Sequence, residues 1–372
     1  MDAHFERLFT YEAGTELFAQ TNKPFYRPDD TTVIADGKVL IAGTPVPIGV
    51  WFIGPPREAG NLAVLHARCN HISVTSLKRN LSTLTAQELG LKVDFNEKVE
   101  PCVPCSVHRI TDGPSRHASV PMAAREKREQ PVLPSATSVT IYADHIGPYS
   151  PTSYNGNSYA LVCIAVFTEA DKRYNIIPGN LSYVAPMQNL KAATTVNAIL
   201  TFTAWLRTHG HAVDEVLSDM SKAGLADSNE LQQRGCAVGL KIRPLAPRTK
   251  NTTARVDVHI RWLKEAMQCS LTTAAVSTQF WDHSLSMASA MHNDLPSTTN
   301  GGNSPNALFG IQGCLAFRRV PFCYCVVFVP EEPRGQGGLN PRGIEALYLG
   351  TDARTGLSRC FDANSSHQLS RR

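Results

Sequence analysis

Two histidines and two cysteines near the start of the chain have a spacing that suits a metal site. His66 and His71 stand five positions apart, and Cys102 and Cys105 form a C-x₂-C about thirty residues later. Two imidazoles and two thiolates are a ligand set that tetrahedral Zn²⁺ prefers, and four protein ligands leave no open position. The spacing therefore predicts a structural zinc site. The alternative is that two histidines and a chance C-x₂-C are unrelated.

Two aspartates stand where predicted strands run out into loops. Asp144 follows the apolar TIYA, and Asp219 follows EVLS. Metal-dependent phosphoryl transfer needs several carboxylates that converge on one or two Mg²⁺ ions, and the ends of adjacent strands can bring them together. The alternative is that each aspartate forms a turn, which is the commoner role for a single Asp at a strand end.

A third feature is a basic stretch between residues 241 and 264, in which Asp257 is the only acid. Positive charge gathered in this way predicts a surface that binds nucleic-acid phosphates, and the alternative is an ordinary solvated basic face. The basic residues of this stretch are Lys241, Arg243, Arg248, Lys250, Arg255, Arg261 and Lys264.

The elements that must position these residues change character along the chain. Residues 1–58 are β-rich in short runs, and 59–106 combine helical periodicity with the histidines and cysteines. Residues 107–137 are rich in Pro, Arg and Ser and read as a linker. Strands interleaved with helices over 138–292 predict an α/β domain, and short β runs over 305–365 predict a small C-terminal β domain.

Composition excludes several classes of protein. The chain has 372 residues and a formal net charge of only +4, so total charge does not by itself indicate a nucleic-acid binder. No apolar run is long enough for a membrane span, and the acidic N-terminus is not a secretory signal. We therefore expect a reducing compartment, in which the ten cysteines are thiols or metal ligands, with Cys69 and His108 as spare donors near the zinc site.

An ordered series of stretches resembles the integrase region of copia-type LTR retrotransposon polyproteins. The resemblance covers roughly residues 30–362, and the order of the motifs carries it more than any single one. The stretches are LHARCNH with CVPC for the pre-integrase zinc module, TIYADHIGPYSPTSYNGNSYALVCIAVF and EVLSDM for the two catalytic strands, HIRWLKEAMQCSL for the last catalytic helix, QFWDHSLSMASAMHNDLPS for the Phe-Trp helix, and GCLAFRRV to RCFD for the C-terminal β region.

This resemblance implies a ribonuclease H-like integrase core, preceded by a zinc module and followed by a small β region. It also implies DNA strand transfer by an Asp-Asp-Glu triad with two Mg²⁺ or Mn²⁺ ions, in which Asp144 and Asp219 are the first two carboxylates. Integrases of the family that the chain resembles act as multimers in the nucleus. We therefore expect nucleic acid as partner, a homo-oligomer or a larger complex, and no membrane.

The third carboxylate departs from the family pattern. Alignment of the helix places Asp257 where the family has Glu, whereas counting from Asp219 reaches Arg255. Asp is one methylene shorter than Glu, which matters where metal geometry is tight. The family's Asn-Gly after the second Asp is replaced by Met220-Ser221 in this chain.

These departures leave two hypotheses for the function. The first is an active integrase-like enzyme. The second is a domesticated, catalytically inactive copy that serves as a structural or binding subunit of a larger complex, with RNA as one component to test. The sequence begins with Met and contains neither protease nor reverse transcriptase, so we expect a free-standing protein or an isolated fragment. A recruited copy would be organellar or cytoplasmic instead of nuclear.

Overall fold

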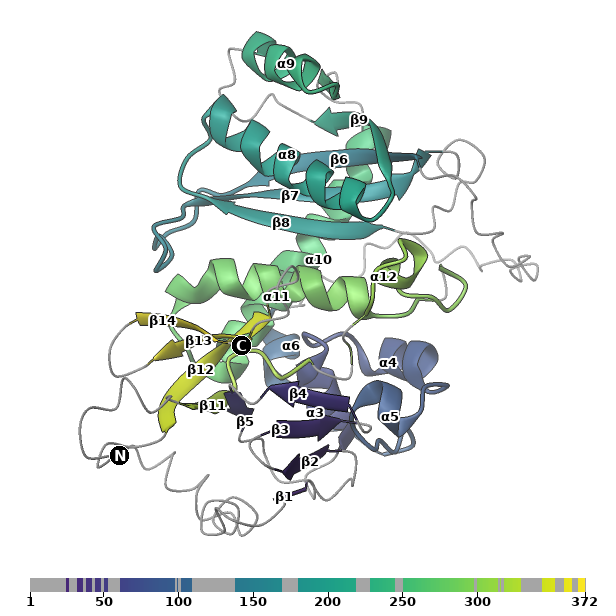
Figure 1. Cartoon of the computed structure of the whole chain (residues 1–372), viewed down its shortest axis with the longest axis vertical. Helices are drawn as coiled ribbons and strands as arrows, with labels where there is room; N and C mark the ends of the chain where they lie inside the picture. Colours follow the sequence, from purple (N-terminus) through teal and green to yellow (C-terminus); the bar gives the residue numbers. More distant parts are fainter. Residues whose placement is uncertain are drawn as a thin grey trace. The chain divides into compact units, whose positions relative to one another are not determined.

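The computed structural model describes the chain in segments (Figure 1). The described residues are the short strands within 25–52, then 61–97, 99, 102–108, 138–168, 180–218, 228–244, 250–297, 300–313, 315, 318–328, 343–351, 358–362 and 367–371. Their contacts divide the chain into two units. The larger unit is Asn70–Ser82 with Pro101–Cys314, and the smaller one is Met1–Cys69, Thr83–Glu100 and Leu315–Arg372.

The larger unit contains a mixed five-stranded sheet in the order β10-β9-β6-β7-β8. β6, β7 and β8 are antiparallel neighbours, whereas β9 and β10 run parallel to β6. A mixed sheet interleaved with helices confirms the predicted α/β class. The strands are β6 Ser138–Ile146, β7 Tyr159–Phe167, β8 Leu181–Met187, β9 Ala212–Ser218 and β10 Lys241–Pro244.

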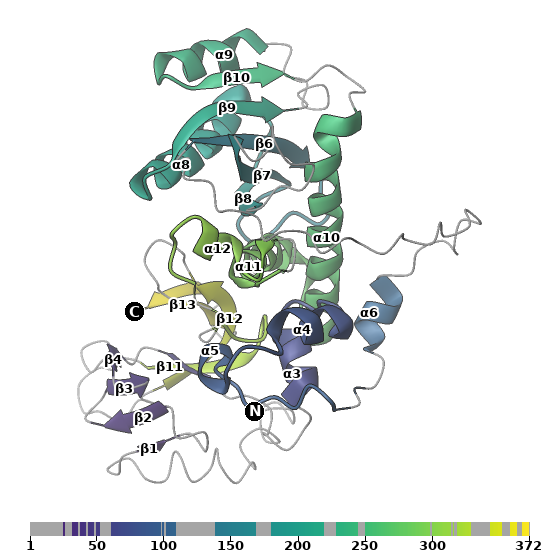
Figure 2. The same ribbon diagram turned by 90° about the vertical axis from the view of Figure 1, so that its right-hand side faces the viewer.

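Helices cover both faces of this sheet (Figures 1 and 2). On one face α8, Ala192–Thr208, packs Val196, Ile199 and Phe202 against Ile141 and Ala143 of β6 and against residues of β7. On the other face α10, Lys250–Ala274, contacts β6 and β7. Because side chains alternate along a strand, neighbouring residues of β6 face different helices.

The other helices of the larger unit surround α10 and the sheet. α11, Trp281–Asp294, packs against α10 and β8, and its entry is formed by the 3₁₀ turn η2, Thr278–Phe280. α6, Val103–His108, also packs against α10, and Figure 2 shows the two side by side. The remaining helices of this unit are α4 Val74–Leu81, α9 Ser228–Ala237 and α12 Pro305–Leu308.

The smaller unit holds two antiparallel sheets. Its four-stranded sheet has the order β1-β2-β3-β4, and its five-stranded sheet has the order β14-β13-β12-β11-β5. β5 comes from the N-terminal part of the chain and pairs with β11 from the C-terminal part. The strands are β1 Phe25–Tyr26, β2 Thr32–Ala35, β3 Lys38–Ile41, β4 Thr44–Pro47, β5 Val50–Phe52, β11 Tyr324–Phe328, β12 Gly343–Thr351, β13 Ser358–Asp362 and β14 His367–Arg371.

The described part of the smaller unit also contains two helices. α3, Asn61–Arg68, buries Leu62 and Leu65 completely. α5, Ala86–Leu89, begins with a capping box, in which Thr85 accepts from the Glu88 amide and the Glu88 carboxylate accepts from the Thr85 amide. The helical periodicity expected within 59–106 is therefore divided among the short helices α3, α4, α5 and α6.

Some predicted elements differ from the structure. The stretch HIRWLKEAMQCSL, expected to form the last catalytic helix, lies within the longer helix α10, which begins at Lys250 and ends at Ala274. Residues 318–320, expected in a β run, have no regular structure. Among the C-terminal strands β11 pairs with β5, so the C-terminal strands form a sheet jointly with the N-terminal part. The five domain boundaries stay predictions, and linker residues 109–137 lie outside the described part of the chain.

Candidate metal centre and carboxylate site

The predicted histidine and cysteine ligands meet in one group. The ligand atoms of His66, His71, Cys102 and Cys105 all lie within 4.8 Å of one another. Within the group, Cys102 Sγ lies 3.3 Å from His71 Nδ1. Ligand atoms of a tetrahedral zinc site with these donors are roughly 3.5 Å apart, so the group fits the size of such a site.

Short elements bring these ligands together. His66 belongs to α3, Cys102 precedes α6 and Cys105 lies on it, and both histidines are buried. His71 follows α3 in a turn in which it and Asn70 have positive φ angles, 60° and 50°. Asn and His are among the residues that enter this left-handed region more readily than most, so the turn suits its sequence.

Zinc is a metal that this group could bind. The donor set is two imidazole nitrogens and two sulfurs, which matches the soft, tetrahedral preference of Zn²⁺. With all four positions filled by protein, the site would serve structure and would have no room for a reacting water. Among the described residues, Cys69 lies buried nearby but is not a member of the group.

The first predicted catalytic carboxylate is buried at the end of a central strand. Asp144 of β6 is 3% exposed, and its Oδ1 accepts a hydrogen bond from the His145 amide at 2.8 Å. Ala143 faces α8, so the alternation of β6 directs Asp144 to the face that α10 covers. The strand ends two residues later, and Gly147 has φ +113°, where an added Cβ would lie 2.6 Å from the Ser158 carbonyl oxygen.

His145, next to Asp144, points to the α8 face. Its Nε2 lies 3.0 Å from the Thr195 hydroxyl. Burial lowers the pKa of His145 to about 4, so the ring is neutral near pH 7. It therefore brings no positive charge close to the Asp144 carboxylate.

Within the described residues, neither of the other two members of the predicted triad is seen beside Asp144. Asp219, with Met220 and Ser221, lies outside the described part of the chain. The strand that precedes Asp219 is parallel to β6, and its last residue, Ser218, pairs with Ala143. Asp257 lies on α10 and is exposed, although its neighbour Val256 is buried. The side chain of Arg255, the alternative, is outside the described residues.

The predicted basic surface is only partly described. Lys241 and Arg243 are exposed on β10, and the Arg243 guanidinium lies 3.4 Å from the Glu215 carboxylate on β9. On α10, Arg261 is exposed and Lys264 is half-buried. Arg248 lies outside the described residues, as do the side chains of Lys250 and Arg255.

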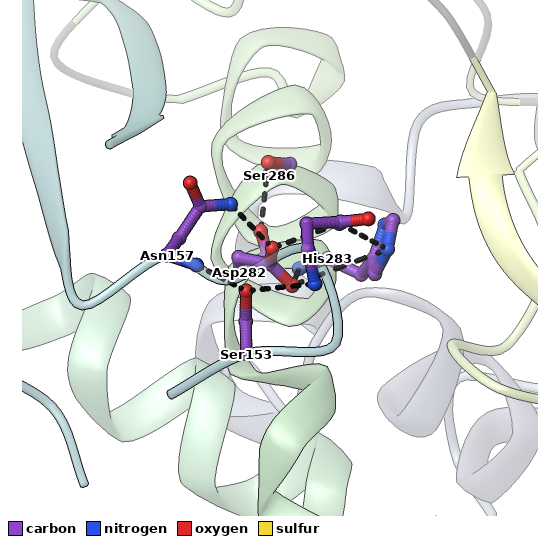
Figure 3. Close-up of polar contacts among 6 residues, drawn as sticks. Ser153, Asn157, Asp282, His283 and Ser286 are labelled. Carbon is purple, nitrogen blue, oxygen red and sulfur yellow. Dashed lines mark hydrogen bonds and ion pairs between the residues drawn. The ribbon is translucent and has the colours of Figure 1, made fainter. Parts of the chain in front are cut away.

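A buried carboxylate that sequence analysis missed lies at the start of α11. Figure 3 shows Asp282 enclosed by polar groups from the β6–β7 connection. Its Oδ2 accepts from the Asn155 and Asn157 side-chain amides at 3.0 and 2.9 Å, and its Oδ1 accepts from the His283 amide at 2.8 Å. A carboxylate in the first helical turn also interacts favourably with the helix dipole.

The Asp282 cluster serves to fix a loop. The connection that leaves β6 after Asp144 is anchored to α11 by these bonds, while Ser153 Oγ accepts from the backbone amides of Asn155 and Asn157. The Ser286 hydroxyl in Figure 3 donates to the Asp282 carbonyl oxygen at 2.8 Å. Two of the family-like stretches contain these residues, but the sequence did not show that they meet, because Asp282 is more than a hundred residues from Asn155 and Asn157.

Two more histidines are buried between α10, α11 and β8. His259 Nε2 lies 2.7 Å from the Ser182 hydroxyl, and His292 Nε2 lies 3.0 Å from the Asn180 carbonyl oxygen. The ring centroids of the two histidines are 4.6 Å apart. Burial lowers the pKa of both, and His292 lowers that of His259 further. Both rings are therefore neutral near pH 7.

Comparison with known proteins gives structural neighbours only. No protein-family profile matches the chain, and no curated protein matches it. One solved structure that resembles it is the catalytic core domain of BIV integrase, at 15% identity and a TM-score of 0.31, over 46% of this chain and 92% of that one.

A second is the simian T-cell lymphotropic virus intasome in complex with PP2A regulatory subunit B56 gamma, at 14% identity and a TM-score of 0.35. That match spans 65% of this chain and 77% of the other. These two neighbours are retroviral integrase structures, while the α/β assignment of this chain rests on its own sheet order and helix packing.

Proposed function

We propose that the chain is an integrase-like protein of copia-type retrotransposon descent, with a ribonuclease H-like core, which binds nucleic acid and catalyses metal-dependent DNA strand transfer. The observation that carries the proposal is the parallel pairing of β6 with β9. This register sets Ala143 beside Ser218, and the residues that follow these two in the sequence are Asp144 and Asp219. Carboxylates at the ends of adjacent parallel strands suit divalent metal ions.

The proposed roles of the residues follow from their chemistry. Asp144 and Asp219 would hold Mg²⁺ or Mn²⁺ through their oxygens, with Asp257 as the third carboxylate. Such ions supply the activation of a water for end processing and of a DNA 3′-hydroxyl for strand transfer. The buried position of Asp144 supports this role, because a carboxylate removed from bulk water binds a cation more strongly than an exposed one. The basic residues between 241 and 264 would contact DNA phosphates.

A strand-transfer and end-nicking assay with Mn²⁺ tests the proposal. We expect activity in the wild type and its loss in Asp144→Asn. Asp214→Asn is a matched control, because Asp214 is an exposed aspartate near the opposite end of β9. Activity that survives Asp144→Asn would exclude Asp144 as a metal ligand.

A second candidate function is favoured by the exposure of Asp257. An exposed aspartate in the place of the family's glutamate has a shorter reach and stays in water. On this hypothesis the chain is a domesticated, inactive integrase fold that acts as a structural or binding subunit of a larger complex. A wild type that is folded and zinc-loaded, yet inactive, and that purifies from its source in a stoichiometric complex would support it. Nuclease treatment of that complex would then reveal an RNA component.

The proposed partners and location depend on which function holds. An active integrase-like protein would act on DNA in the nucleus as a homo-oligomer, and a recruited copy would be organellar or cytoplasmic. None of the described helices is both long and apolar enough to cross a bilayer. Tagged protein localised in cells of its source would separate these possibilities.

A further inference from the structure

The hydroxyl group of Thr273 lies between a backbone carbonyl and a predicted metal ligand. Thr273 Oγ1 is 2.7 Å from the Cys269 carbonyl oxygen, one turn earlier on α10. The same oxygen is 2.9 Å from Nε2 of His71, which is 202 residues away in the sequence. His71 Nδ1, the other ring nitrogen, faces Cys102 Sγ at 3.3 Å.

The single proton that the Thr273 hydroxyl can donate determines which tautomer the His71 imidazole adopts. A threonine hydroxyl has one proton to donate, and a carbonyl oxygen can only accept. The proton of Thr273 therefore goes to the Cys269 carbonyl, and the Thr273 oxygen accepts from the Nε2–H of His71. A neutral imidazole has one N–H, so Nδ1 keeps its lone pair. That lone pair points toward Cys102, into the His/Cys group.

Neighbouring residues of α10 hold the turn that contains Asn70 and His71 through separate hydrogen bonds. The Ser270 hydroxyl donates to Asn70 Oδ1 at 3.1 Å, and Asn70 Nδ2 donates to the Met287 carbonyl of α11 at 3.3 Å. The Thr272 hydroxyl lies 2.7 Å from Nε2 of His108, at the end of α6. The last turns of α10 thus contact both the turn that carries His71 and the helix that carries Cys105.

We infer that Thr273 is a positioning residue for the metal site: it accepts the Nε2–H of His71 and so presents Nδ1 to the metal. The inference rests on zinc binding by the His/Cys group and adds the part of α10 that orients one ligand. Histidine ligands of metals commonly donate their second ring N–H to an acceptor that fixes the ring, and loss of such an acceptor weakens metal binding about 10–100-fold.

The test compares three variants of the full-length chain. Thr273→Val keeps the shape of the side chain and removes the hydroxyl, and Thr273→Ser restores the hydroxyl. Thr272→Val is the matched control, because it removes the neighbouring hydroxyl that contacts His108, which is not one of the four ligands. Zinc affinity is measured by competition with a chromophoric chelator, after circular dichroism has shown that each variant is folded.

We expect Thr273→Val to bind zinc about 10–100-fold more weakly than the wild type, and Thr273→Ser and Thr272→Val to stay within about threefold of it. Long-range ¹H–¹⁵N spectra of the zinc-loaded wild type should show His71 coordinated through Nδ1 with a proton on Nε2. The Co²⁺-substituted wild type and Thr273→Val should differ in their visible absorption, because the orientation of the imidazole differs.

Each contrary result has a separate meaning. Wild type that binds no zinc would overturn both the metal site and the role of Thr273. Zinc-loaded wild type with His71 coordinated through Nε2, or a Thr273→Val variant with unchanged affinity, would overturn only the positioning role. Equal losses in Thr273→Val and Thr272→Val would show that the α10 surface acts as a whole, and this too would overturn the specific role of Thr273.

Discussion

The His/Cys group and the carboxylate region differ in how completely the described residues build them. In the His/Cys group, four donors lie within 4.8 Å of one another. In the carboxylate region, Asp144 is buried at a strand end, whereas Asp257 is exposed on α10. The same helix serves both regions: its last turns contact the loop of His71, and its first half carries Asp257.

The contrast shows what preorganisation of a metal site requires. Ligands are held in a productive geometry when their other polar atoms are bonded as well, as His71 is by Thr273. An exposed carboxylate such as Asp257 keeps the freedom to move between rotamers until a metal or substrate orders it. We therefore expect metal binding at the His/Cys group to stabilise the fold, and metal binding at the carboxylates to affect activity alone.

The largest expected effect is the loss of zinc from the His/Cys group. Replacement of Cys102 or Cys105 by Ser, or removal of the metal with a chelator, should lower the free energy of unfolding by several kcal/mol, because metal binding to such a site contributes directly to folding. Thermal unfolding combined with metal analysis measures this. Cys236→Ser is the control, since this thiol is exposed on α9. Equal stability with and without zinc would contradict the prediction.

The next largest effect is expected at Asp282. In Asp282→Asn, one of the two side-chain atoms that accept hydrogen bonds becomes a donor and faces another donor. An unsatisfied buried donor costs about 1–3 kcal/mol, so denaturant unfolding should show a loss of this size. Ser286→Ala, which removes only a bond to the Asp282 carbonyl within the same helix, should change stability by less than about 0.5 kcal/mol. A wild-type-like Asp282→Asn would mean that the loop is held by other contacts.

An effect of comparable total size, but spread over the acid pH range, is expected from pH. Burial holds the pKa values of His145, His259 and His292 below the 6.5 of a free imidazole, so these residues bind protons more readily in the unfolded chain. Stability should therefore be full above about pH 6.5 and should fall as the pH drops below it, by up to about 1.4 kcal/mol per pH unit for each histidine. Urea unfolding at pH 7.5, 6.5 and 5.5 measures the slope.

The variant His292→Gln tests the origin of that slope. It removes one of the three titrating groups, and it should make the decline between pH 6.5 and 5.5 shallower by about the share of one histidine. A slope that does not change would show that carboxylates, not the buried histidines, control the acid side of the stability curve.

The smallest effect on stability is expected at Asp257. Because the side chain is exposed, Asp257→Asn and Asp257→Glu should each change the free energy of unfolding by less than about 0.5 kcal/mol. Their effects on strand transfer should be far larger. Asp257→Asn should lose the activity, and Asp257→Glu should keep or increase it, because Glu restores the longer side chain. Equal activity of all three forms would remove Asp257 from the proposed triad.

Much of the fold class and of the metal group could be predicted from local sequence. The strand that carries Asp144 reads as an apolar run followed by a turn, and the structure has β6 over Ser138–Ile146, which continues two residues past Asp144. The four members of the His/Cys group could be predicted because residue type and spacing limit which donors reach one ion. The length of α10 could not be predicted in the same way, since helix ends depend on contacts as well as on periodicity.

The rest depends on pairings between distant segments, which local patterns do not encode. Residue types and their order determined that the chain is α/β, that His66, His71, Cys102 and Cys105 could form a metal group, and that an apolar strand leads into Asp144. Only the tertiary structure decided that Thr273 supports His71, that Asn155 and Asn157 enclose Asp282, and that β5 pairs with β11. The physical reason is that burial and hydrogen-bond partners depend on packing between residues more than a hundred positions apart in the sequence. Secondary-structure propensity and motif spacing act only between residues a few positions apart.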